Sequence, residues 1–149
     1  MSGPTAVIDT SVFAGAKNPE EPRHQECQQL LELAHQHRFR AVVSAITVAE
    51  VCTGYHVEKD DLGRGIFLDY LRSADVFDIV PIDLALADSA ARVRARTSLK
   101  LPDALILAAG LARSAKFVIT HDDDLSKAGA LLPSLSAGEF LRRLGSGSR

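Results

Sequence analysis

The sequence has few cysteines, no long hydrophobic run and no strong excess of charge, and each absence removes a class of protein. Cys27 and Cys52 are the only cysteines among 149 residues. Both lie in segments expected to be helical, so no disulfide framework is expected and a reducing compartment is indicated. No apolar stretch approaches the roughly 18 residues of a membrane span, and the N-terminus lacks a signal-peptide pattern. We therefore expect a cytoplasmic protein with no membrane partner.

The charge balance argues against a broad basic surface. Lysine and arginine number 17 against 19 acidic residues, which gives a formal net charge of −2. Such a chain is not expected to hold nucleic acid through many phosphate contacts alone. An anionic ligand would need a local positive group, and a divalent cation held by carboxylates is one solution. The composition, 46% hydrophobic and 24% charged, is that of an ordinary globular protein.

Short buried strands alternate with amphipathic helices along the chain. The expected strands are residues 6–8, 41–43, 77–80 and 117–120, and the expected helices are 21–37, 46–54, 66–72, 83–96, 103–114 and 137–144, with one more beginning after Asp9. This alternation predicts a single α/β domain with a central, mostly parallel sheet of four to five strands flanked by helices. We assign residues 1–144 to the domain and residues 145–149 to a flexible tail or cloning remnant.

Four acidic residues are expected at one edge of this sheet. Asp9 and Asp122 follow predicted strands, whereas Glu50 and Asp103 lie near the starts of predicted helices. Open parallel sheets bind ligands at the carboxyl ends of their strands, which is where these residues would meet. Each also has a structural explanation: a helix cap for Asp9, a capping box with Thr47 for Glu50, the helix dipole for Asp103 and an Asx turn for Asp122.

Carboxylates gathered in this way require a cation. Two of them about 5 Å apart repel by roughly 3 kcal/mol at an effective dielectric constant near 20. Oxygen ligands favour Mg²⁺ or Mn²⁺ over zinc, and no set of histidines and cysteines has the spacing of a zinc site. His35 and His37 are interpreted as a solvated helix end. An ion held here would support attack of water on a phosphodiester.

The acidic residues lie in four motifs, VIDTSVF at residues 7–13, AITVAEV at 45–51, LPDALILA at 101–108 and VITHDDDL at 118–125. Together the motifs resemble the PIN domain, and within it the VapC-type toxin ribonucleases of bacterial and archaeal toxin–antitoxin pairs. The resemblance covers nearly the whole chain, from Ala6 to about Leu144. It implies a Mg²⁺- or Mn²⁺-dependent endoribonuclease that cleaves RNA, forms a homodimer and is held inactive by a VapB-type antitoxin.

The resemblance also implies roles for the four carboxylates. By position, Asp9 and Asp103 would be the principal metal ligands, and Glu50 and Asp122 would complete the catalytic site. For the antitoxin, the resemblance suggests a groove lined by apolar residues of the second and third helices.

The three consecutive aspartates leave one assignment open. Asp122 is preferred by its spacing from Thr120, with Asp124 as a more distant partner of the metal site and Asp123 as a solvated residue. The hydroxyls of Thr10 and Thr120 are candidates to lie near water on the metal, and helix capping or strand packing explains them equally well.

Alternative functions are distinguished by single positions. A haloacid-dehalogenase-like phosphatase needs an aspartate two residues after its first, and Ser11 stands there, where many PIN relatives have asparagine. A PIN-domain RNA-processing nuclease without an antitoxin, or a nuclease-dead binding module, remains open. Arg92, Arg94 and Arg96 are either a phosphate-binding edge or a plain solvated helix face.

Overall fold

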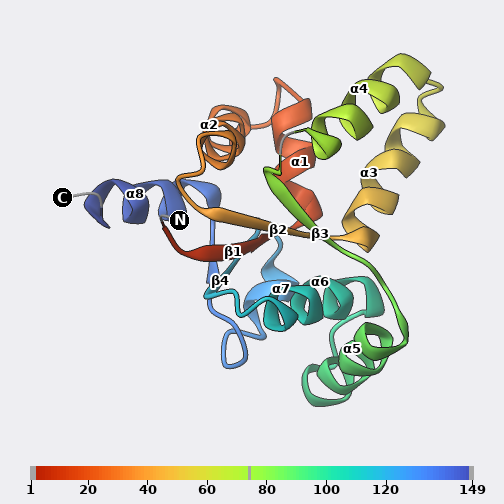
Figure 1. The fold of residues 1–149 in the computed structure, drawn as a ribbon, viewed down its shortest axis with the longest axis vertical. Coiled ribbons are helices and arrows are strands. Elements are labelled where there is room, and N and C mark those ends of the chain that lie inside the picture. The colour runs from red at the N-terminus through yellow and green to blue at the C-terminus, as the bar shows by residue number, and fades with distance from the viewer. Residues whose placement is uncertain (1–2, 74, 148–149) are drawn as a thin grey trace.

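Five parallel strands form the centre of the fold, seen in a computed structural model that describes residues 3–73 and 75–147 (Figure 1). The strands are β1 (Thr5–Ile8), β2 (Arg40–Ser44), β3 (Phe77–Val80), β4 (Phe117–Ile119) and β5 (Ser134–Leu135). Their order across the sheet is β3-β2-β1-β4-β5, and every neighbouring pair is parallel. The predicted single α/β domain is confirmed, and β1 occupies its central position.

Helices cover both faces of this sheet. They are α1 (Thr10–Lys17), α2 (His24–His35), α3 (Ala45–Val57), α4 (Asp61–Arg72), α5 (Leu84–Thr97), α6 (Leu101–Ala112), α7 (Asp123–Ser126) and α8 (Ala137–Gly147). Figure 1 shows α1 to α4 on one face and α5 and α6 on the other. Within the described residues, no helix has the length and hydrophobicity needed to cross a membrane.

The alternation of side chains along the strands creates one hydrophobic core on each face. Ala6 and Ile8 of β1 point into the core under α1, α2 and α8, whereas Val7 points into the core under α5 and α6. Helix α6 is buried on most of its surface, as its run of alanine, leucine and isoleucine predicts. Its Gly110 lies directly over Val7, because a Cβ at that position would be 2.7 Å from Val7 Cγ1.

Several helix ends differ from the sequence-based prediction. Helix α2 begins at His24, so Pro22 precedes the helix instead of lying in its first turn. Helix α4 begins about five residues earlier than predicted, because the Asp60 carboxylate accepts a 2.8 Å hydrogen bond from the Gly63 backbone and caps it. Helix α3 continues past Gly54 to Val57. Helix α8 extends to residue 147, three residues into the segment expected to be a tail.

Two local predictions about side chains have different outcomes. The capping box at Ser136 and Glu139 is confirmed, since each side chain accepts a hydrogen bond from the other residue's backbone N–H. The interpretation of His35 as solvated is wrong. Its ring stacks on Tyr70 with a centroid distance of 4.6 Å, which ties α2 to α4. Neither Cys27 nor Cys52 forms a disulfide, as expected.

Candidate active site

The candidate site lies at the carboxyl end of β1, between β2 and β4. Ile8 and Ile119 are paired at the ends of their strands, and the Asp9 backbone N–H donates a 3.0 Å hydrogen bond to the Ile119 carbonyl. Asp9 and Thr120 therefore emerge side by side. Helix α3 leaves the end of β2 on the other side, and this brings Glu50 toward the same edge.

Asp9 is held by two hydroxyl groups. Its side chain is only 4% exposed, and its Oδ2 accepts hydrogen bonds of 2.8 Å from Ser11 Oγ and 2.7 Å from Thr120 Oγ1. Asp9 has the backbone angles of an N-cap, but its carboxylate makes no capping hydrogen bond to α1. The carboxylate is thus fixed across the sheet edge and does not serve the helix.

The same two hydroxyls connect Asp9 to the loop that carries Asp122. The His121 backbone N–H donates to Ser11 Oγ at 3.0 Å, and the Asp122 backbone N–H donates to Thr120 Oγ1 at 2.9 Å. Each hydroxyl therefore accepts from the loop and donates to Asp9. We call Ser11, Thr120 and Asp9 the hydroxyl bracket. It fixes the start of α7 relative to the end of β1.

Glu50 is positioned by Thr10 and not by a capping box. Thr10 Oγ1 donates a 2.6 Å hydrogen bond to Glu50 Oε1, and Thr47 Oγ1 lies 3.2 Å from the same hydroxyl. The cap of α3 is Ser44, whose side chain accepts from the Ile46 backbone at 3.2 Å. The capping-box explanation of Glu50 is therefore wrong, and Glu50 is held against the first turn of α1.

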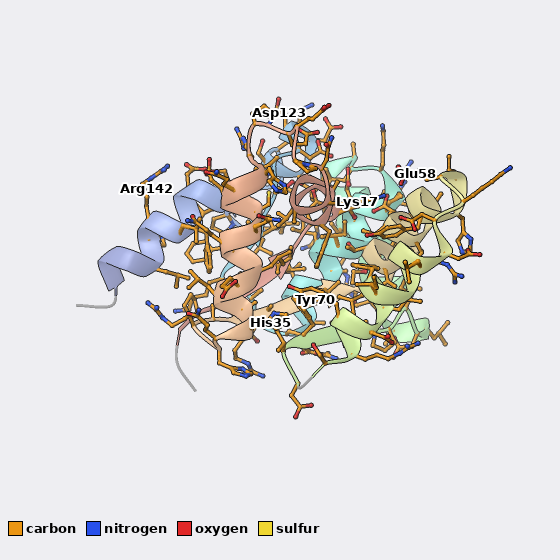
Figure 2. All side chains as sticks on the ribbon, turned by 90° about the horizontal axis from the view of Figure 1, so that it is seen from above. Lys17, His35, Glu58, Tyr70, Asp123 and Arg142 are labelled. Atoms are coloured by element: carbon orange, nitrogen blue, oxygen red, sulfur yellow. The ribbon has the colours of Figure 1, made fainter. Side chains whose placement is uncertain are left out.

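Three aspartates come together from two helices. Ligand oxygens of Asp103, Asp122 and Asp124 all lie within 4.8 Å of one another. Asp103 is in the first turn of α6, and Asp122 caps α7 by accepting a 2.9 Å hydrogen bond from the Asp124 backbone. Asp124 also pairs with Lys127 at 3.2 Å. Asp123 is exposed and lies at the outer edge of the molecule in Figure 2, as predicted.

Asp103 senses every carboxylate of the candidate site. Its pKa is raised to about 6, first because the group is partly buried and then because Asp122, Asp9, Glu50 and Asp124 surround it with negative charge. The four predicted residues thus act on one point in space. Asp124 belongs with them more closely than the sequence suggested. The Asx turn at Asp122 was the signal that could have placed Asp124 in the first turn of a short helix.

His121 is a residue near the site that sequence reasoning missed. Its Nε2 accepts a 3.2 Å hydrogen bond from the Ala137 backbone, and its Nδ1 lies 4.0 Å from Cys27 Sγ. Burial is the main reason that the pKa of His121 is lowered, and Arg23 adds to it. Burial likewise raises the pKa of Cys27 to about 11. A neutral imidazole therefore joins the β4–α7 loop to α8 and to an unreactive thiol.

The donor set fits a hard divalent cation. Every close ligand atom is a carboxylate oxygen, which is the type of ligand that Mg²⁺ and Mn²⁺ prefer. The raised pKa of Asp103 is the mark of negative charge with no nearby compensation. A cation bound among these aspartates would remove that repulsion.

Solved structures with the same fold come mainly from toxin–antitoxin systems. FitAcB from Neisseria gonorrhoeae aligns with a TM-score of 0.67 at 20% identity, over 89% of this chain and 98% of that chain. A toxin–antitoxin complex from Klebsiella pneumoniae aligns at 0.66 and 25%, over 89% and 97%. VapC20 of Mycobacterium tuberculosis, a sarcin-ricin loop cleaving toxin, aligns at 0.67 and 19%, over 83% and 95%.

Comparison with curated protein sequences found no match. The family comparison gave a match to the PIN domain over residues 6–131. This span begins in β1, ends after α7 and includes all five carboxylates of the site. The chain therefore belongs to the PIN domain family, as its four motifs predicted.

Proposed function

We propose that the protein is a metal-dependent endoribonuclease that hydrolyses RNA phosphodiester bonds, and that it is the toxin of a VapBC-type toxin–antitoxin pair. The observation that carries the nuclease proposal is the group of Asp103, Asp122 and Asp124, whose oxygens lie within 4.8 Å of one another beside Asp9 and Glu50. A net charge of −2 makes such a group costly unless a cation binds there.

Mg²⁺ or Mn²⁺ would be held by Asp103 and Asp122, with Asp9, Glu50 and Asp124 close enough to share the ion or its water molecules. When bound, the ion would supply positive charge for the phosphate oxygens and lower the pKa of an attacking water. Ser11 and Thr120 keep the Asp9 carboxylate in one orientation.

The hydrogen bond from Thr10 gives Glu50 a defined place at the edge of the site. An ionised Glu50 oxygen there can accept a proton from, or orient, the attacking water. The four residues Asp9, Glu50, Asp103 and Asp122 form the proposed catalytic site.

The toxin proposal is supported by the kinds of protein that share this fold. The structure that aligns at 25% identity belongs to a toxin–antitoxin complex, and its chain is covered almost completely. A second neighbour is VapBC-1 from nontypeable Haemophilus influenzae, at 16% identity. We extend to this chain the role of a toxin that a VapB-type antitoxin binds.

The antitoxin would bind beside α2. A hollow of about 530 Å³ lies there, and its lining includes Ala16 of α1, Leu31 of α2 and Tyr70 of α4. Figure 2 labels His35 and Tyr70, which stack in its wall. The prediction of a groove between the second and third helices is therefore wrong in part, since α4 takes the place of α3. Exposed Leu62 and Ile66 extend the apolar surface along α4.

We also propose a homodimer. Leu84, which is 90% exposed, and the exposed Ile82 and Leu101 lie near the carboxyl edge of the sheet. Burial of these side chains against a second copy would remove apolar surface from water. Sedimentation equilibrium checks this part of the proposal, because a monomer at all accessible concentrations would contradict it.

The proposal is tested by expression and by RNA cleavage. Expression in bacteria without the neighbouring gene is expected to arrest growth, and co-expression of that gene is expected to restore it. The purified protein should cleave RNA in Mg²⁺ or Mn²⁺ and not in chelator. Cleavage without growth arrest would favour an RNA-processing nuclease without an antitoxin. Metal binding without cleavage of any RNA would favour a nuclease-dead binding module.

A further inference from the structure

A hollow on the opposite face of the sheet from the proposed antitoxin surface combines apolar walls with positive charge. Its volume is about 250 Å³, and it lies between α5 and α6. Val93, Ala108, Leu111 and Leu131 contribute apolar lining. Small-molecule pockets usually measure roughly 300–1,000 Å³, so this hollow suits one unit of a longer chain better than a complete ligand.

Two arginines border the hollow without any partner of their own. Arg92 and Arg96 are one helical turn apart on α5, which places their Cβ atoms about 6 Å apart. Among the described residues, neither guanidinium makes a hydrogen bond or an ion pair. Arg94, by contrast, donates a 2.7 Å hydrogen bond to the Leu99 carbonyl. The pair Arg92 and Arg96 is therefore free to bind an anion.

The surrounding charge favours an anionic ligand. Residues 89–100 contain three arginines and Lys100 but no acidic residue, although the chain as a whole is negative. This is the most basic stretch of the sequence that adjoins the candidate site. Attraction of a phosphate to this edge would offset its repulsion by the carboxylates nearby.

Helix α6 connects the hollow with the candidate site. Asp103 is in the first turn of α6, and Ala108 lines the hollow five residues later, which is a rise of about 7.5 Å along the axis. Neighbouring phosphates of an extended strand are separated by a comparable distance. A strand whose scissile phosphate lies at Asp103 can therefore reach Arg96 within a few nucleotides.

We propose that this hollow binds one nucleotide of single-stranded RNA flanking the cleaved bond, with the phosphate on Arg92 and Arg96 and the base against Leu111 and the guanidinium planes. The inference rests on the proposed function, since it assumes that RNA is the substrate. Stacking of bases on guanidinium groups and apolar side chains, together with phosphate contacts, is the usual basis of single-strand binding.

The test measures binding separately from cleavage. Fluorescence anisotropy of a labelled single-stranded RNA 12-mer in chelator keeps the RNA intact, and repulsion from the carboxylates is the same in every variant. Arg92→Gln/Arg96→Gln should bind about tenfold more weakly. The slope of log K against log salt should become shallower by about 1.4, for two lost phosphate contacts. Ala112→Leu, which narrows the hollow without changing charge, should weaken binding several-fold and leave the slope unchanged.

Arg72→Gln is the matched control. It removes the same charge from the exposed surface of α4, where Arg72 pairs with Asp69 at 3.3 Å. Equal weakening by this control and the double variant would overturn the inference, because binding would then depend only on net charge. Wild-type affinity and slope in the double variant would also overturn it, and a change of oligomeric state with unchanged RNA binding would assign the surface to a protein interface. Failure of the wild type to cleave RNA in Mg²⁺ contradicts the nuclease proposal alone.

Discussion

Thr120 Oγ1 donates a 2.7 Å hydrogen bond to Asp9 Oδ2, although the two residues are 111 positions apart in the sequence. The same oxygen accepts a hydrogen bond from the Asp122 backbone. One hydroxyl therefore sets the distance between the first acidic residue of the site and the last. The geometry of the site depends on this bond as much as on the carboxylates themselves.

Replacing Thr120 by valine should loosen the site without changing its shape. Thr120 is buried, and Thr120→Val leaves the Asp122 N–H without its acceptor and Asp9 without one donor. The expected cost is about 1–3 kcal/mol of unfolding free energy, with at least tenfold slower RNA cleavage. Urea denaturation and a cleavage assay measure the two effects. Thr53→Val on exposed α3 is the control, and equal effects there would contradict the assigned role.

Asp9→Asn and Asp103→Asn should each abolish metal-dependent RNA cleavage while preserving the fold. Either change removes a negative charge from the site but keeps the side chain's volume. For Asp103 we expect metal-free stability at pH 7 to rise by about 1 kcal/mol, allowing for solvent screening of a partly exposed group. Circular dichroism and isothermal titration with Mg²⁺ separate folding from metal binding. Cleavage retained in chelator by either variant would be incompatible with the mechanism.

The metal-free protein should lose stability as the pH rises. The pKa of Asp103 is raised to about 6 from a model value of 3.8, so the folded state binds its proton more tightly than the unfolded state does. Its contribution to stability is full below pH 4 and is lost as the pH rises through 6. Urea midpoints between pH 4.5 and 7.5 in chelator, compared with those of Asp103→Asn, isolate this term. Saturating Mg²⁺ should restore stability at pH 7.

Gly110→Ala should destabilise the fold by about 1–3 kcal/mol. A Cβ at Gly110 would lie 2.7 Å from Val7 Cγ1 and 3.1 Å from Leu132 Cδ2, and the buried core leaves Val7 little freedom to move. Gly54→Ala on α3 is the matched control, because nothing lies within 4 Å of its Cβ. That change should stabilise the protein by about 0.5–1 kcal/mol. Thermal unfolding measures both, and a stable Gly110→Ala would contradict the close approach of α6 to β1.

The sequence predicted those parts of the fold that have a local signal. The apolar run before Asp9, and the Asp83 side chain that accepts from Leu86 N–H to cap α5, both have the predicted structure. Helix α7 and strand β5 were missed, since four and two residues are too few to show a hydrophobic period.

The contacts of the site could be predicted only in part. That strand ends carry Asp9 and Asp122 to one edge follows from the topology of a parallel sheet. The partner of Glu50 does not, because local spacing favours Thr47 whereas packing of α1 against α3 supplies Thr10 from 40 residues away. Tertiary packing also decides that Asp124 lies as near Asp103 as Asp122 does.

The central place of β1 in the sheet makes the site a late product of synthesis. The ribosome releases β1 first, but its neighbour β4 ends at Ile119 and Asp124 lies further on. A nascent chain that has not yet emerged beyond these residues has no hydroxyl bracket and only half of its acidic group. The N-terminal half can pair β1 with β2 and collapse, yet it carries no complete centre for chemistry. Whatever this centre does, it is armed only when nearly the whole polypeptide is available.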